Sequence, residues 1–184
     1  MDTVDPYMFI ESAALRGWSG CGDDPSFEGS SYGELIADER DIVPVKNSGG
    51  VGVGLMVGGD SVSVIRERTG PVFVIRQGTT NRSDAALAGC FCGVVRGGWD
   101  RVCDLEWRDA EGVLFHAPEA GDDVARWLAG DVVVKNPAER MAIVVPMAIG
   151  TYVVERKDLG NLVAQVPDVI VGGYYTLVRL RLAP

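Results

Sequence analysis

The stretch from Ser48 to Arg76 restricts the possible folds of this chain more than any other part of its sequence. It reads SGGVGVGLMVGGDSVSVIRERTGPVFVIR, so valine and isoleucine recur between short glycine-containing links. Branched side chains of this kind favour an extended backbone and pack well on a pleated sheet. Glycine in the links supplies the positive φ that a tight hairpin needs. We therefore expect three consecutive strands in one antiparallel sheet, at Val51–Val57, Ser61–Arg66 and Val72–Arg76.

A helix is expected after these strands. Ser83 is a residue type that caps helix N-termini, and Asp84 follows in the first turn, where a carboxylate is favoured. The segment Ala85–Val95 is apolar on almost every side, which indicates a helix packed against the sheet. Gly97 and Gly98 would end this helix.

Most of the remaining chain favours strands. Short helical segments are expected within Ser31–Arg40 and from Asp122 to Leu128. The other apolar segments have β spacing; they are Tyr7–Glu11, Ile42–Val45, Trp99–Trp107, Val113–His116, Val132–Lys135, Met141–Met147, Thr151–Glu155, Leu162–Val166 and Tyr174–Leu182. The expected fold class is α+β, a predominantly antiparallel β-sheet with one main helix (about Ser83–Val95) and a β-rich C-terminal extension.

The length of the chain suits one domain with a substantial core, since 47 % of its 184 residues are hydrophobic. We expect an α+β domain over residues 1–130 and a β-rich extension over residues 131–184 packed on it, or a single domain overall. No apolar run approaches the roughly 20 residues of a membrane-spanning helix. Asp2 and Asp5 stand where a secretory signal carries positive charge. These features predict a cytoplasmic protein with no membrane partner.

The negative charge of the chain is concentrated near its start. The net charge is −9, and Met1–Asp41 holds ten of the 26 acidic residues but only two of the 17 basic ones. Attraction to phosphate groups requires lysine and arginine, so this distribution argues against nucleic acid as a partner. Such an acidic segment is either a solvated edge that keeps the protein soluble or a surface that meets a basic partner.

The sequence offers little for catalysis or for cofactor and metal binding. His116 is the single histidine, and no nucleophile elbow, zinc-protease helix or P-loop is present. The glycine run at residues 50, 52 and 54 opens a strand rather than a helix, so it indicates close backbone packing and not a dinucleotide site. We therefore expect no enzymatic activity and no cofactor.

The four cysteines do not form a convincing site either. Cys21, Cys90, Cys92 and Cys103 contain no C-x-x-C pair. A zinc site built from Cys90, Cys92, Cys103 and His116 would lack the usual ligand spacing. Buried packing explains Cys90 and Cys92 more simply, because small apolar residues surround them. No metal is expected.

Several short motifs occur in an order that suggests a family. They are Phe9–Ala13, Gly17-Trp18-x-Gly20, Tyr32 and Asp38, Gly54–Asp60, Val72–Arg76, Ser83–Leu87, Trp99 and Val113–Asp122. In this order, over roughly Tyr7–Asp123, the chain resembles one group of bacterial immunity proteins, the cytoplasmic partners that neutralise polymorphic toxins. It departs from that pattern at His116, where the family has an acid, and after Asp60, where the family has proline. The segment from Val132 to Leu182 falls outside the resemblance.

The resemblance implies an α+β fold, no catalysis and tight binding to one cognate toxin domain. It assigns no toxin activity and no binding residues. A non-catalytic structural or assembly subunit of a phage or secretion particle is the alternative, because the glycine content and the β-rich tail suit that class as well. An immunity protein would be a monomer or a small homo-oligomer.

The acidic N-terminal segment also contains aromatic residues, and this combination predicts where a partner would bind. Aromatic anchors surrounded by charged residues are typical of interface hot spots. A toxin that attacks nucleic acid, such as a nuclease, would offer a basic cleft for these carboxylates. The alternative is that the acids are merely solvated and Trp18 lies in the core. The candidate contacts are Trp18, Asp23, Asp24, Phe27, Glu28, Tyr32, Glu34, Asp38 and Glu39.

Overall fold

The computed structural model describes residues 6–22, 26–47, 49–56, 61–77, 97–131, 142–166 and 169–184. The helix expected at Ser83–Val95, the strand expected at Val132–Lys135, and Cys90 and Cys92 lie outside these residues. The candidate contacts Asp23 and Asp24 lie outside them as well.

Over the residues that the structure describes, the protein is mostly β. The three helices among the described residues are short: η1 (Ser12–Gly17), α1 (Ser31–Ile36) and α3 (Gly121–Ala129). The expectation of an α+β fold with one main helix is therefore wrong. The reason is that the apolar strands pair into two separate sheets, so no single sheet with one helix on its face forms the core.

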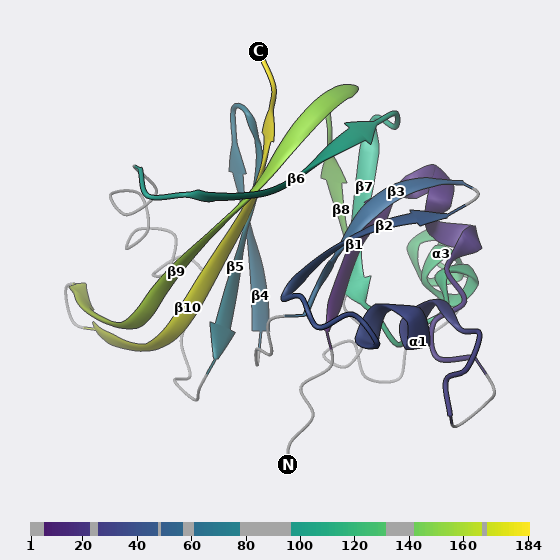
Figure 1. Cartoon of the computed structure of the whole chain (residues 1–184), viewed down its shortest axis with the longest axis horizontal. Helices are drawn as coiled ribbons and strands as arrows, with labels where there is room; N and C mark the ends of the chain where they lie inside the picture. Colours follow the sequence, from purple (N-terminus) through teal and green to yellow (C-terminus); the bar gives the residue numbers. More distant parts are fainter. Residues whose placement is uncertain are drawn as a thin grey trace. The chain divides into compact units, whose positions relative to one another are not determined.

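Both sheets are antiparallel and five-stranded (Figure 1). The first has the order β2-β3-β1-β7-β8 and contains β1 (Tyr7–Glu11), β2 (Ile42–Asn47), β3 (Gly50–Leu55), β7 (Glu111–His116) and β8 (Ala142–Pro146). The second has the order β4-β5-β10-β9-β6 and contains β4 (Ser61–Glu67), β5 (Gly70–Gln77), β6 (Asp100–Trp107), β9 (Gly150–Val166) and β10 (Val169–Leu182).

The three strands expected in one sheet belong to two. Strand β3 is paired on both sides, with β2 along one edge and β1 along the other. No edge of β3 remains for β4, which instead pairs with β5 in the second sheet. The expectation of one antiparallel sheet is wrong for this reason, although each strand lies close to its expected position.

The chain divides into two compact units, and neither is continuous in sequence. One comprises Met1–Val57 with Leu105–Thr151, and the other comprises Gly58–Asp104 with Tyr152–Pro184. This division differs from the expected one at residue 130. The long C-terminal strands β9 and β10 share a sheet with β4 and β5, so the C-terminal segment contributes to a unit that begins much earlier in the chain.

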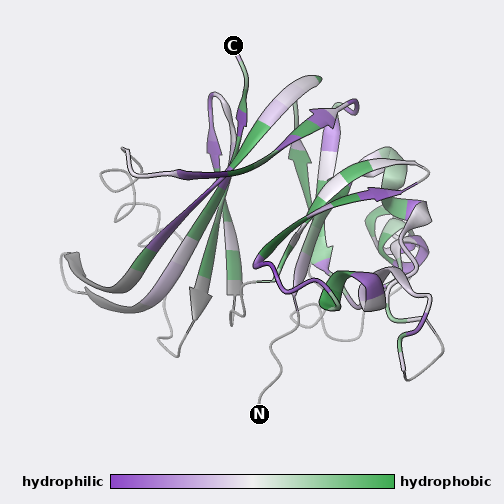
Figure 2. Cartoon of the chain, in the orientation of Figure 1, coloured by the Kyte–Doolittle hydropathy of each residue, from purple (hydrophilic) through white to green (hydrophobic). Residues whose placement is uncertain are grey.

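The helices of the first unit pack on one face of its sheet. The buried cluster there combines strand residues such as Met8, Ile10 and Phe115 with Leu15 of η1 and Leu35 of α1. Figure 2 shows hydrophobic and hydrophilic stretches along the strands of both sheets. Alternation along a strand turns every second residue toward a core.

The glycines of β3 explain how α1 comes so close to the sheet. A Cβ atom at Gly54 would lie 2.2 Å from Cδ1 of Leu35, and one at Gly52 would lie 2.5 Å from the carbonyl oxygen of Phe9. Register pairs Gly54 with Met8, so the glycines are on the face that the helices cover. Their expected role in close packing is confirmed, since any larger residue would meet atoms already in place.

Within the described part of the chain, no helix has both the length and the apolar character needed to cross a membrane.

Candidate functional site

The acidic segment of residues 26–41 is anchored on the first unit by a short helix. Ser30 caps α1, because its Oγ accepts a hydrogen bond from the backbone N–H of Gly33 at 2.9 Å. The helix continues for only six residues and buries Leu35, which is 2 % exposed. A helix this short is not stable alone, so its position depends on its contacts. These are the buried Leu35, the cap, and hydrogen bonds from the N–H of Ser31 to Oγ of Ser19 at 2.8 Å and from the N–H of Tyr32 to the carbonyl oxygen of Gly20 at 3.1 Å.

Trp18 lies in the core and is not an exposed anchor. Its side chain is 2 % exposed, and its indole N–H donates a hydrogen bond of 2.8 Å to the carbonyl oxygen of Ala117. The ring also meets Phe115 edge-on, with 6.5 Å between centroids. The sequence allowed Trp18 to be either a partner contact or a core residue, and in the structure it is a core residue.

Phe27 and Tyr32 form a half-buried aromatic pair ahead of and within α1. Their rings meet edge-on, with 5.3 Å between centroids. Phe27 has a φ of 60°, which few residues other than glycine adopt. Its carbonyl oxygen accepts hydrogen bonds from both the backbone N–H and the hydroxyl of Ser30, at 3.2 and 2.7 Å. The turn is thus fixed, and part of each ring remains open to solvent.

The carboxylates of this segment differ in how they are used. Glu28, Glu34 and Glu39 are exposed. Asp38 is instead held by Arg40, whose Nε and Nη2 donate to the two carboxylate oxygens at 2.9 and 2.6 Å. Hydrogen bonds from the side chain and the backbone of Arg40 lower the pKa of Asp38 from 3.8 to about 2. Glu28, Glu34 and Glu39 are therefore better placed than Asp38 to meet a partner.

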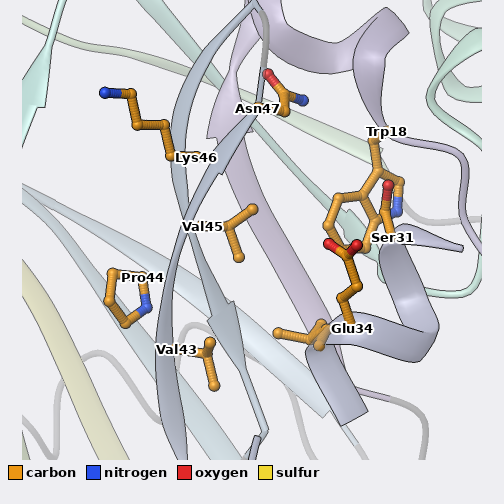
Figure 3. Close-up of a pocket in the computed structure, with 9 residues that line it drawn as sticks. Trp18, Ser31, Glu34, Val43, Pro44, Val45, Lys46 and Asn47 are labelled. Carbon is orange, nitrogen blue, oxygen red and sulfur yellow. The ribbon is translucent and has the colours of Figure 1, made fainter. Parts of the chain in front are cut away.

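The structure adds a pocket that sequence reasoning missed. It has a volume of about 260 Å³ and lies between α1 and β2 (Figure 3). Figure 3 shows Glu34, Val43 and Val45 projecting toward the space between the two elements, whereas Pro44 and Lys46 project from the opposite side of β2. The lining residues are Trp18, Ser31, Glu34, Leu35, Val43, Pro44, Val45, Lys46 and Asn47.

The sequence contained a partial signal for this pocket. The alternation Val43-Pro44-Val45 indicates that both valines face one side of a strand. Nothing local indicates that α1 returns beside that strand, because the approach depends on Leu35 packing over Gly54. The pocket is therefore a product of tertiary packing.

Strand β2 forms one edge of the first sheet, and Pro44 limits what can pair with it. The N–H of Met56 donates to the carbonyl oxygen of Asp41 at 2.8 Å, so these opposed residues direct their polar groups toward each other. By alternation, residues 42, 44 and 46 direct theirs away from β3. Pro44 has no N–H, so the outer edge lacks its central donor, a common protection of edge strands.

Other polar groups of the first unit have structural partners. Glu11 is 2 % exposed, and its two carboxylate oxygens accept hydrogen bonds from the backbone N–H groups of Val51, at 2.8 Å, and of Arg108. It thereby ties β1 to β3 and to the end of β6. His116 meets Tyr7 edge-on, with 4.8 Å between ring centroids.

Among the side chains that the structure describes, no group of three or more histidine, cysteine, aspartate or glutamate residues could hold a metal ion. Cys21 and Cys103 are half-buried.

Comparison with known proteins gives no relative. No protein-family model matches the chain, and no curated protein and no solved structure matches it.

Proposed function

We propose that this chain is an immunity protein that neutralises a cognate bacterial toxin by binding it directly in the cytoplasm. The observation that supports this most is the exposed acidic segment of residues 26–41, which carries five acidic residues and one basic residue. Leu35 and the cap at Ser30 hold this segment against a buried core, so its charges are presented from a defined position.

The chemistry of this surface favours a basic protein partner. Carboxylates on a preformed surface attract a cationic cleft, such as that of a nuclease, and accelerate the encounter. Nucleic acid and anionic membranes are unsuitable partners for the same segment because like charges repel. Phe27 and Tyr32 supply aromatic area beside the acids, and aromatic residues often contribute most of the binding energy of an interface.

Growth of bacteria tests the proposal directly. The chain is co-expressed with the product of each neighbouring gene, and survival of cells that otherwise die identifies the toxin. With that toxin in hand, replacing Asp23, Asp24 and Glu28 by lysine should weaken binding by several kcal/mol and make association less sensitive to salt. Failure of rescue with every neighbouring gene product contradicts the proposal.

A matched control separates local contacts from overall charge. Asp100, Glu111 and Asp131 are exposed residues that lie outside the segment in the sequence, and replacing them by lysine changes the net charge by the same amount. The control variant should keep wild-type affinity within a small factor. Equal losses in the two triple variants would mean that no defined acidic surface exists.

A second candidate function is favoured by the length of β9 and β10. These strands pair with each other over most of their 17 and 14 residues, and β10 pairs with β5 only over residues 174–179. Long β-ribbons often exchange or pair between subunits, as an assembly subunit of a phage or secretion particle would require. Light scattering distinguishes the candidates, since an immunity protein should remain a monomer or small oligomer at all concentrations.

A further inference from the structure

We propose that the pocket between α1 and β2 receives an arginine side chain of the partner protein, with its guanidinium group on the carboxylate of Glu34. This inference rests on the proposed function and names the chemistry by which the partner is recognised. It rests on the composition of the pocket walls, on the exposed carboxylate of Glu34 and on the missing N–H donor at Pro44 of β2.

The size of the pocket suits one side chain. Sites for drug-sized ligands and cofactors span about 300–1,000 Å³, whereas this pocket has about 260 Å³. Its walls combine the aliphatic groups of Leu35, Val43 and Val45 with the ring of Trp18. Such walls favour the apolar stem of a long side chain and the flat face of a guanidinium group.

The polar group of the pocket selects a cation. Glu34 is exposed and projects toward the space between α1 and β2 (Figure 3). Within the described ranges, no cation forms an ion pair with Glu34, in contrast to Asp38, which Arg40 occupies. Lys46 lines the pocket but projects from the other side of β2. Arginine matches a carboxylate better than lysine does, because its planar donors bind both oxygens at once.

The outer edge of β2 disfavours the main alternative, in which the partner adds a strand to the first sheet. Such a strand would face the outward polar groups of residues 42, 44 and 46 and would lose its central hydrogen bond at Pro44. Insertion of one side chain beside β2 needs none of these backbone groups. The pocket therefore indicates a side-chain anchor.

A peptide probe tests the pocket without the toxin. A short neutral-capped peptide containing one arginine is titrated into the whole protein and followed by amide NMR, in parallel with the same peptide containing citrulline. Citrulline has nearly the same shape as arginine but no charge. The arginine peptide should bind in the millimolar range and shift the signals of Ser31, Val43, Val45 and the Trp18 indole N–H. The citrulline peptide should not.

Two matched variants locate the charge that matters. Glu34→Gln should weaken binding of the arginine peptide by about tenfold or more, as expected for loss of a charge-assisted hydrogen bond. Glu39→Gln removes an equal charge from an exposed residue that does not line the pocket, and it should change the affinity by less than about twofold. Equal binding of the citrulline peptide, or equal losses in the two variants, would overturn the proposal.

The outcomes also separate this inference from the proposed function. If the wild-type chain and Glu34→Gln both protect cells from the toxin with equal strength, and the arginine peptide shifts no pocket signal, the pocket assignment fails while the immunity function stands. If the peptide binds as expected but no neighbouring gene product is neutralised, the pocket stands and the immunity function fails. Shifts confined to the amides of Ile42 and Lys46 would indicate strand addition and overturn the pocket assignment.

Discussion

Replacing Gly54 by alanine tests whether the glycines of β3 are required for the approach of α1. A Cβ atom at residue 54 would lie 2.2 Å from Cδ1 of Leu35, and 3.1 and 3.2 Å from its Cδ2 and Cγ. Non-bonded carbon atoms prefer separations of about 3.5–4.0 Å. Leu35 is only 2 % exposed, so its whole isopropyl group must move within a packed core. Overpacking of this kind costs about 1–3 kcal/mol.

The size and sign of the effect depend on Leu35. Alanine is better than glycine in a strand by roughly 0.5–1 kcal/mol, so the net destabilisation by Gly54→Ala should be about 1–2 kcal/mol. Leu35→Ala alone should cost about 2–5 kcal/mol, because it leaves a cavity. In that background the clashing atoms are gone, and the methyl group of Ala at residue 54 fills part of the cavity. Gly54→Ala should then stabilise by about 1 kcal/mol.

Urea denaturation of the four proteins in this cycle measures the coupling between the two residues. Tryptophan fluorescence and far-ultraviolet circular dichroism should give midpoint shifts at an unchanged slope. Gly52→Ala is the matched control, because its Cβ would meet the backbone oxygen of Phe9 at 2.5 Å and not the side chain of Leu35. It should destabilise in both backgrounds. A Gly54→Ala effect of the same sign and size with and without Leu35 would refute the reasoning.

Three further outcomes are expected. Trp18→Phe should cost about 1–3 kcal/mol in a thermal or urea titration, because the carbonyl oxygen of Ala117 would remain buried without its 2.8 Å donor; unchanged stability would mean that this hydrogen bond contributes nothing. Burial raises the pKa of Glu155, but hydrogen bonds and charge from Arg179 and Arg181 outweigh it and hold the pKa below 4.5. The stabilisation that the Glu155 carboxylate provides should therefore be present above about pH 4.5 and decrease as the pH falls through the lowered pKa. Glu155→Gln should make stability depend less on pH in this acidic range. An unchanged pH dependence in the variant would contradict the pairing of Glu155 with Arg179 and Arg181. Excess EDTA should leave the melting temperature unchanged, and a clear decrease would reveal a structural metal.

The part of the candidate site that could be predicted was its composition. The acidic excess of the N-terminal segment and the presence of Phe27 and Tyr32 follow from the sequence, and both rings are half-exposed. The position of Trp18 could not be predicted, because its burial depends on Phe115 and Ala117, about a hundred residues later. The hydrogen bond that Arg40 donates to Asp38 joins residues only two apart, so sequence reasoning could have considered it.

The sequence by itself determined the position of most strands, although the two strands expected at Thr151–Glu155 and Leu162–Val166 form one continuous strand, β9, and β10 begins at Val169 and not at Tyr174. Strand β1 has the expected bounds, Tyr7–Glu11, and β4, β5 and β7 lie within two residues of theirs. Short helices begin at or next to their expected starts at Ser31 and Asp122. These features depend on alternation, on β-branched residues and on capping, which act within a few residues of the chain.

Only the tertiary structure decided which strands are neighbours. Strands β3, β4 and β5 follow one another in the chain, yet β3 pairs with β1 and β2, whereas β4 pairs with β5 and β5 pairs with β10. Backbone hydrogen bonds are the same for every strand, so local sequence does not identify the partner. The choice is made by side chains brought together from distant parts of the chain, as when Gly54 admits Leu35. The pocket beside β2 arises from packing of this kind, and no single stretch of the sequence contains it.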